Sequence, residues 1–140
     1  MSEISTQLVI DAVTRALRAA YPEATIWDDE VDQGISSGAF IVQLINAGQR
    51  RIVGPRFHCT PLFDVIYFSD NSGPECIRIA DELCQVLVMV ETPGGDTLHG
   101  TGMEWRVDDH VLHFTVSYSY YIRIDSEKPD METLQVQIQE

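Results

Sequence analysis

The segment "VLHFTVSYSYYIRI", residues 111–124, constrains the fold most strongly, because apolar and polar side chains alternate along nearly all of it. A period of two is typical of a β-strand that buries one face. One face carries Leu112, Phe114, Val116, Tyr118, Tyr120, Ile122 and Ile124. The other carries His113, Thr115, Ser117, Ser119, Tyr121 and Arg123. Since Asp108-Asp109-His110 separates this run from "TGMEWRV", the two segments are predicted to form a β-hairpin.

Two other segments have apolar residues at helical spacing. Residues 4–20 are predicted to be a helix that ends before Tyr21-Pro22, and either Ser2 or Ser5 is a candidate N-cap. A second helix is predicted after Ser72 or Gly73, with Pro74 in its first turn. The expected buried residues are Ile4, Leu8, Val13, Leu17 and Ala20 in the first helix, and Ile77, Ala80, Cys84, Leu87 and Val88 in the second.

Three further segments are predicted to be strands, namely "ATIWDD", "GAFIVQLINA" and "RFHCTPLFDVIYFS". The second is apolar on both faces and is expected to be central in a sheet. Pro61 predicts a bulge or an edge position in the third, because proline cannot donate a backbone hydrogen bond. The order α-β-β-β-α-β-β favours one α+β domain over residues 1–125, a mostly antiparallel sheet with two helices packed on one face. Residues 126–140 are expected to be a linker and a C-terminal extension.

The chain ends in "METLQVQIQE", where apolar residues again alternate with glutamine. A lone strand is not stable in water, so this one needs a sheet edge in its own chain or in another molecule. We call residues 131–140 the C-terminal arm. Its side chains expected to face that sheet are Met131, Leu134, Val136 and Ile138.

The charge balance excludes several functions. Nine basic and 22 acidic residues in 140 give a formal net charge of −13. This argues against a nucleic-acid binder and against docking to an anionic membrane. Three cysteines without a CxxC pair favour neither a disulfide framework nor a zinc site. The sequence also lacks a secretory signal and a membrane span, so synthesis in a reducing cytoplasm is expected.

No catalytic, metal or cofactor site is predicted. His110 and His113 fall on opposite faces of a strand, which is a poor arrangement for shared metal binding. The acidic segment Asp28-Asp29-Glu30 with Asp32 lacks the glycine of a calcium loop, and a solvated face explains it better. A small enzyme or ligand-binding domain using His110, His113 and Asp109 remains an alternative if these residues line a pocket.

The basic residues are concentrated in one place. Arg50, Arg51 and Arg56 are three of only nine, and they lie within seven positions of a strongly acidic chain. Electrostatic matching to an acidic surface explains this cluster better than a solvated loop does. The most available acidic surface is a second copy of this chain, so self-association or an acidic partner is predicted.

The chain also resembles the tail terminator proteins of tailed bacteriophages, in particular those of contractile-tailed phages and prophages. The resembling stretches, in order, are "YPEATIWDDEVDQGISSGAFIVQLIN", "QRRIVGPRFHCTPLFDVIYF", "ECIRIADELCQVL", "LHGTGMEWRVDDHVLHFTVSYSYYI" and "KPDMETLQ". They cover nearly the whole chain, although no single motif is a signature.

The resemblance implies a structural virion protein without a catalytic site, made in the bacterial host. Tail terminators form six-fold rings on the tail tube, stop its polymerisation and offer a surface to the neck. In contractile tails they also meet the last sheath ring. DNA would pass through the ring without specific binding, which suits a negative charge. Another ring protein of the same particle, a head–tail connector or neck component, remains an alternative.

A ring needs head-to-tail contacts between different patches of neighbouring copies. Arg50, Arg51 and Arg56 are predicted to face the acidic segment of the next copy, which comprises Asp28, Asp29, Glu30 and Asp32. The C-terminal arm could add to a neighbour's sheet edge.

Overall fold

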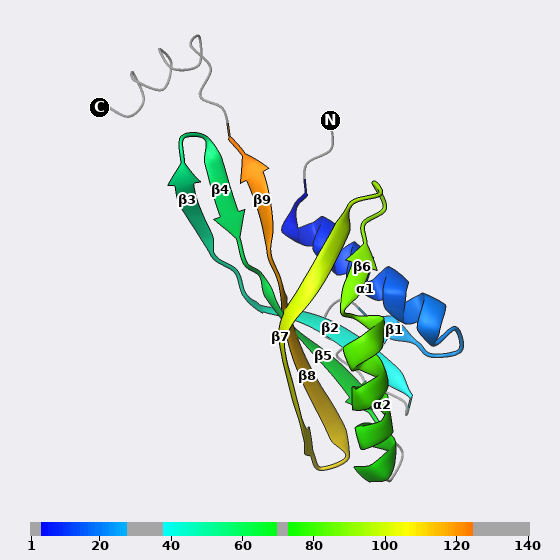
Figure 1. The fold of residues 1–140 in the computed structure, drawn as a ribbon. Helices are drawn as coiled ribbons and strands as arrows, with labels where there is room; N and C mark the ends of the chain where they lie inside the picture. The colour runs from blue at the N-terminus through cyan, green and yellow to red at the C-terminus, as the bar shows by residue number, and fades with distance from the viewer. Residues whose placement is uncertain (1–3, 28–37, 70–72, 125–140) are drawn as a thin grey trace.

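The computed structural model describes residues 4–27, 38–69 and 73–124 (Figure 1). The elements are α1 (Thr6–Ala20), β1 (Ile26–Trp27), β2 (Ala39–Asn46), β3 (Gln49–Val53), β4 (Arg56–Cys59), β5 (Leu62–Phe68), α2 (Gly73–Val86), β6 (Met89–Glu91), β7 (Thr97–Asp108), β8 (Val111–Tyr118) and β9 (Tyr120–Arg123). The fold is α+β and mostly antiparallel, as predicted from the sequence. The predicted order is incomplete, because it lacks β3 and β6 and merges two pairs of strands, β4 with β5 and β8 with β9.

Six strands form the main sheet, in the order β1-β2-β5-β8-β7-β6. Only the short β1–β2 pair is parallel among the described pairings, and the others are antiparallel. Both helices pack on one face of this sheet (Figure 1). Alternate residues of the central strands point toward them and are buried, among them Phe40, Phe63, Val65, Leu112 and Phe114.

Helix α1 begins at Thr6, two residues after the predicted start, and ends at Ala20 as predicted. Of the two candidate caps, Ser5 is the one used, and its side chain accepts a hydrogen bond from the backbone N–H of Leu8 at 3.2 Å. Val13 and Leu17 are buried as expected. Ala20 is exposed, and Val9 and Ala12 fill the core instead, so the buried stripe lies slightly to one side of the predicted one.

The buried face of α2 also differs from the prediction. The prediction holds for Ala80 and Leu87, which are fully buried, but Ile77 and Val88 are exposed and Cys84 is half-buried. The residues that fill the core in their place are Cys76, Ile79 and Leu83. Positions 76, 79, 80, 83 and 87 repeat at helical spacing as well as the predicted set, so the pattern alone left the rotation of the helix open.

The predicted hairpin is confirmed. Strands β7 and β8 pair in antiparallel register, and Asp109 and His110 form the turn with φ angles of 57° and 66°. Two successive positive φ values are the geometry of a tight hairpin turn. From Leu112 to Tyr118 the alternation gives buried and half-buried residues in turn.

The other three strands form a second, smaller sheet in the order β3-β4-β9, which we call the distal sheet. Each strand continues the chain of a main-sheet strand: β2 leads into β3, β4 into β5, and β8 into β9. The expectation that residues 56–69 form one strand with a bulge is therefore wrong. Thr60-Pro61 divides it into β4 and β5 in different sheets, where the Pro61 carbonyl accepts hydrogen bonds from the Tyr118 N–H and the Ser117 hydroxyl.

The distal sheet projects beyond the main sheet and its helices (Figure 1). The chain bends at Gly48, Thr60-Pro61 and Ser119, where the two sheets meet. At this line the Thr60 N–H donates to the Gly48 carbonyl at 2.9 Å. The C-terminal arm, with Leu134, Val136 and Ile138, lies outside the described residues.

Candidate interaction surfaces

The distal sheet brings together the arginines that the sequence singled out. Arg50 and Arg51 lie on β3 and Arg56 on β4, while Arg123 of β9 stands opposite Arg56 in the strand register. All four are exposed. Sequence reasoning missed Arg123, which is 67 positions from Arg56 and falls on the polar side of the alternating run. Only a prediction that residues 56–59 pair as a β-strand with residues 120–123 would have placed Arg123 beside Arg56.

One face of the distal sheet, which we call the basic face, carries Arg50, His58, Arg56, Tyr121 and Arg123. The rings of His58 and Tyr121 stack with centroids 4.7 Å apart. The Arg56 guanidinium lies 5.7 Å from the centroid of the Tyr121 ring. These contacts hold extended side chains in place, which lowers the entropy that a partner must remove on binding.

The opposite face turns toward the core. Cys59 and Tyr120 are buried there, and burial raises the pKa of the Tyr120 hydroxyl. Arg51 lies on this face, with its guanidinium 4.8 Å from the centroid of the Phe57 ring, and donates a hydrogen bond to the Gly54 carbonyl. Arg50 and Arg51 therefore point to opposite faces of β3, so Arg51 supports the end of the sheet while Arg50 contributes to the basic face.

The tip of the distal sheet is apolar. Val53 is 62 % exposed, and Ile52 and Ile124 are also exposed. The Ile124 N–H donates to the Pro55 carbonyl at 2.8 Å, which closes the end of the sheet against the β3–β4 turn. Such a tip suits a protein contact, because the buried centre of an interface is apolar and arginine is enriched in interfaces.

The charge of the distal sheet is opposite to that of the rest. Residues 49–59 and 120–124 contain four arginines and no acidic residue. Because the whole chain carries −13, the remaining residues carry −17. Within the described ranges, neither Arg50 nor Arg56 forms an ion pair. The predicted partner segment of Asp28, Asp29, Glu30 and Asp32 lies outside the residues that the structure describes.

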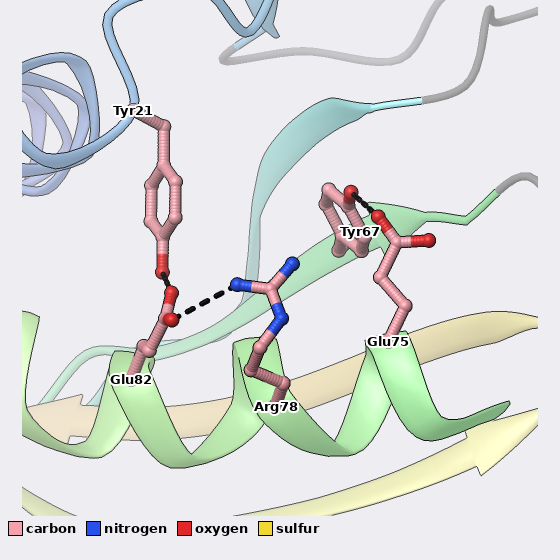
Figure 2. Close-up of polar contacts among 5 residues, drawn as sticks. All are labelled: Tyr21, Tyr67, Glu75, Arg78 and Glu82. Carbon is pink, nitrogen blue, oxygen red and sulfur yellow. Dashed lines mark hydrogen bonds and ion pairs between the residues drawn. The ribbon is translucent and has the colours of Figure 1, made fainter. Parts of the chain in front are cut away.

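A second surface lies where the end of α1 meets α2 (Figure 2). The Tyr21 hydroxyl donates to Glu82 at 2.7 Å, and Arg78 forms an ion pair with the same carboxylate at 3.0 Å. About two turns from Glu82 on the same helix, Glu75 accepts a hydrogen bond from the Tyr67 hydroxyl of β5 at 2.6 Å. Burial, and then the hydrogen bond to each glutamate, raises the pKa of both tyrosine hydroxyls.

Two adjoining cavities open beside these tyrosines. The larger has a volume of about 500 Å³ and is lined by Glu23, Phe40, Tyr67 and Ile79, among others. The smaller, of about 330 Å³, extends to Asp81 and Gln85. They share Ala20 and Tyr21, so we treat them as one surface and call it the Tyr21 groove. Its lining is part apolar and part charged, with Glu23, Asp81 and Glu82 against one cation, Arg78, which is paired with Glu82. The excess of carboxylates suits an amphipathic segment with cationic side chains.

The histidine site that the sequence left open is not assembled. His110 lies in the exposed β7–β8 turn beside Asp109, whereas His113 points to the sheet face away from the helices and pairs with Asp64 at 3.1 Å. Among the described residues, no group of three potential ligands could hold a metal ion. No helix in the described ranges is long and apolar enough to cross a membrane.

A comparison with protein-family models now identifies the chain. The family described as phage tail terminator protein matches residues 8–130, which include both surfaces. The chain belongs to the phage tail terminator family. The resemblance inferred from the sequence is thus confirmed, although the match does not separate contractile from other tails. No curated protein sequence matches the chain.

Membership gives the protein a tail terminator role. The family is structural, its members are components of the virion tail, and they interact with other tail or neck proteins. Surfaces that contact other protein molecules are therefore the functional sites to seek, and the distal sheet and the Tyr21 groove are the two described above.

Proposed function

We propose that copies of this protein form a closed ring, a homohexamer, on the finished end of the tail tube. The ring blocks addition of further tube subunits and presents its other side to the neck or connector, where the head joins. In a contractile tail its rim also meets the last sheath ring. Membership of the tail terminator family supports this proposal.

The observation that carries the ring is the distal sheet. It projects from the subunit, is uniformly basic and ends in an apolar tip on a chain whose remaining charge is −17. A surface that differs so strongly from the rest suits a heterologous contact, in which one patch meets a different patch on the next copy. Repeated around an axis, such contacts close a ring.

The charge also suits the passage of DNA. A duplex moving through the ring carries one negative charge per about 1.7 Å of its axis. If the acidic remainder of each subunit lines the channel, repulsion keeps the duplex from adhering to the wall. In this arrangement the distal-sheet arginines are taken up by subunit contacts and do not face the channel.

The C-terminal arm has a place in the same proposal. The described part of the main sheet ends at one side in β1 and at the other in β6, and β3 forms an edge of the distal sheet. An exposed edge can accept an extra strand from another molecule. We propose that residues 131–140 add to an edge of a neighbouring subunit and extend the contact around the ring.

The proposal is tested by electron microscopy of induced lysates from a strain that lacks this gene. Tubes of uncontrolled length are expected, because nothing stops their polymerisation. Complementation in trans with the intact gene should restore the normal length. Tails of normal length without heads would instead place the protein in the neck, and complete particles would overturn the proposed function.

A further inference from the structure

We propose that the apolar tip of one subunit's distal sheet inserts into the Tyr21 groove of the next subunit. This inference rests on the ring proposed above and names the receiving surface. It places the contact between β3, β4 and β9 of one copy and the α1–α2 end of another.

The tip offers two kinds of group. Ile52, Val53 and Ile124 supply exposed aliphatic side chains at the end of the sheet. Behind them, Arg56 is exposed and lies beside the Tyr121 ring, so its guanidinium is already oriented. Aliphatic side chains followed by a guanidinium are complementary to a groove that has apolar residues inside and carboxylates at its rim.

The Tyr21 groove has that composition. Phe40 and Ile79 lie among the apolar residues of the larger cavity, and Glu23 is exposed at its rim. Asp81 is exposed in the smaller cavity. Within the described ranges, neither Glu23 nor Asp81 forms an ion pair, so both carboxylates are open to a partner cation. The larger cavity, at about 500 Å³, is within the range of small-molecule sites and has room for an aliphatic side chain.

The polar side chains that line the groove bond to one another within the subunit, so the groove is free to receive a partner. Tyr21 and Tyr67 donate to Glu82 and Glu75, and Arg78 pairs with Glu82, so these groups are satisfied within the subunit. They hold the walls of the groove in position (Figure 2). A docking tip therefore meets a shaped receptor and does not have to displace these bonds.

The arrangement of the two surfaces makes this contact intermolecular. The tip lies at the far end of the distal sheet, whereas the groove is lined by Ala20 and Tyr21 at the C-terminal end of α1. Figure 1 shows the end of the β3–β4 hairpin and this end of α1 on opposite sides of the molecule. A subunit cannot reach its own groove with its own tip. A patch that fits a distant, different patch of the same chain generates a ring when the rotation closes.

The inference is tested by photo-crosslinking in assembled particles. Val53 is replaced by p-benzoylphenylalanine in the gene that complements the deletion strain, and cross-linked peptides from purified particles are mapped by mass spectrometry. The expected products are dimers of this chain, joined from position 53 to residues 20–24 or 78–86. The matched control carries the same group at Asp109 in the exposed β7–β8 turn, and it should give no groove products.

A charge exchange provides a second, independent readout. Arg56→Glu should weaken association between copies at least about tenfold, because a charge of the wrong sign then faces the groove. Glu23→Arg with Asp81→Arg in the other copy should recover most of that loss when the two variants are mixed. Association is measured by native mass spectrometry of the purified chains, with folding of each variant checked by circular dichroism.

The outcomes separate the two proposals. Position 53 joined only to residues 28–32, to another part of this chain or to a different tail protein would overturn the groove contact, while tail length control remains intact. The groove contact would also be overturned if mixing the Arg56→Glu variant with the Glu23→Arg/Asp81→Arg variant did not restore association. Normal-length tails in the deletion strain would overturn the proposed function itself.

Discussion

The main sheet and the distal sheet share three continuous chain paths but have opposite properties. Strands β2, β5 and β8 bury side chains against two helices, whereas most residues of β3, β4 and β9 are exposed. The four distal arginines stand against a charge of −17 elsewhere. The difference teaches that one continuous chain path can form a buried strand that stabilises the fold and then an exposed strand suited to binding another molecule.

The largest effect should come from removing a buried ring in the main sheet. Phe63→Ala should lower the free energy of unfolding by about 3–5 kcal/mol, because Phe63 is fully buried and its loss leaves a cavity. Val53→Ala on the distal tip should change it by no more than about 0.5 kcal/mol. Urea unfolding followed by circular dichroism measures both, and equal losses would erase the distinction between the two regions.

A smaller effect is expected from close backbone packing. A Cβ at Gly100 in β7 would lie 2.6 Å from the Leu87 carbonyl oxygen and 2.9 Å from a Val116 methyl group. Gly100→Ala should therefore cost about 1–3 kcal/mol. At the bend between the sheets, Gly48→Ala would meet only the Thr60 hydroxyl at 3.2 Å and should cost less than about 1 kcal/mol. Thermal unfolding of the two variants ranks them, and the reverse order would contradict this account.

Alkaline pH should weaken the helix-covered region through Tyr21 and Tyr67. Their pKa values are raised in the folded state, so their contribution is complete below pH about 10 and is lost as pH rises further. The double variant Tyr21→Phe/Tyr67→Phe should lose less stability between pH 9 and pH 11 than the wild type. Denaturant midpoints at several pH values measure this difference, and parallel curves would show that these hydroxyls do not contribute.

A small effect on stability should also come from the distal arginines. Arg50→Glu with Arg51→Glu should shift unfolding by no more than about 1 kcal/mol, since both side chains are exposed. The same double variant should abolish ring formation, because it reverses two charges of the distal sheet. Electron microscopy of the purified variant checks this, and intact rings would remove the arginines from the interface.

Local patterns in the sequence predicted much of this fold. The positions of both helices and the β7–β8 hairpin follow from periodicity and from residues near the turns. The choice of Ser5 over Ser2 as the cap of α1 did not, because both are serines ahead of the same apolar pattern. The rotation of α2 did not, because Ile77 and Cys84 fit helical spacing as well as Cys76 and Leu83 do. Which face is buried depends on the sheet that the helix meets.

The division into two sheets was also beyond the sequence pattern. Tyr118 and Tyr120 both fit the same alternating series, yet Tyr118 belongs to β8 and Tyr120 to β9. A period of two continues through the bend, so alternation cannot report where one sheet ends. The same reason explains why Arg50, Arg51 and Arg56 were predicted as an interface while Arg123 was missed. The Tyr21–Glu82 hydrogen bond joins residues 61 positions apart, and no local pattern predicts it.

The continuity of strands through Gly48, Thr60-Pro61 and Ser119 has a mechanical consequence. A force on the distal tip is transmitted along three backbone connections, β2–β3, β4–β5 and β8–β9, into the centre of the main sheet. The distal sheet is therefore not a separate domain on a single hinge. Pulling on the tip loads the β2–β5 and β5–β8 ladders in shear, so several hydrogen bonds share the load at once. A subunit built this way transmits tension from its neighbour directly to its own hydrophobic core.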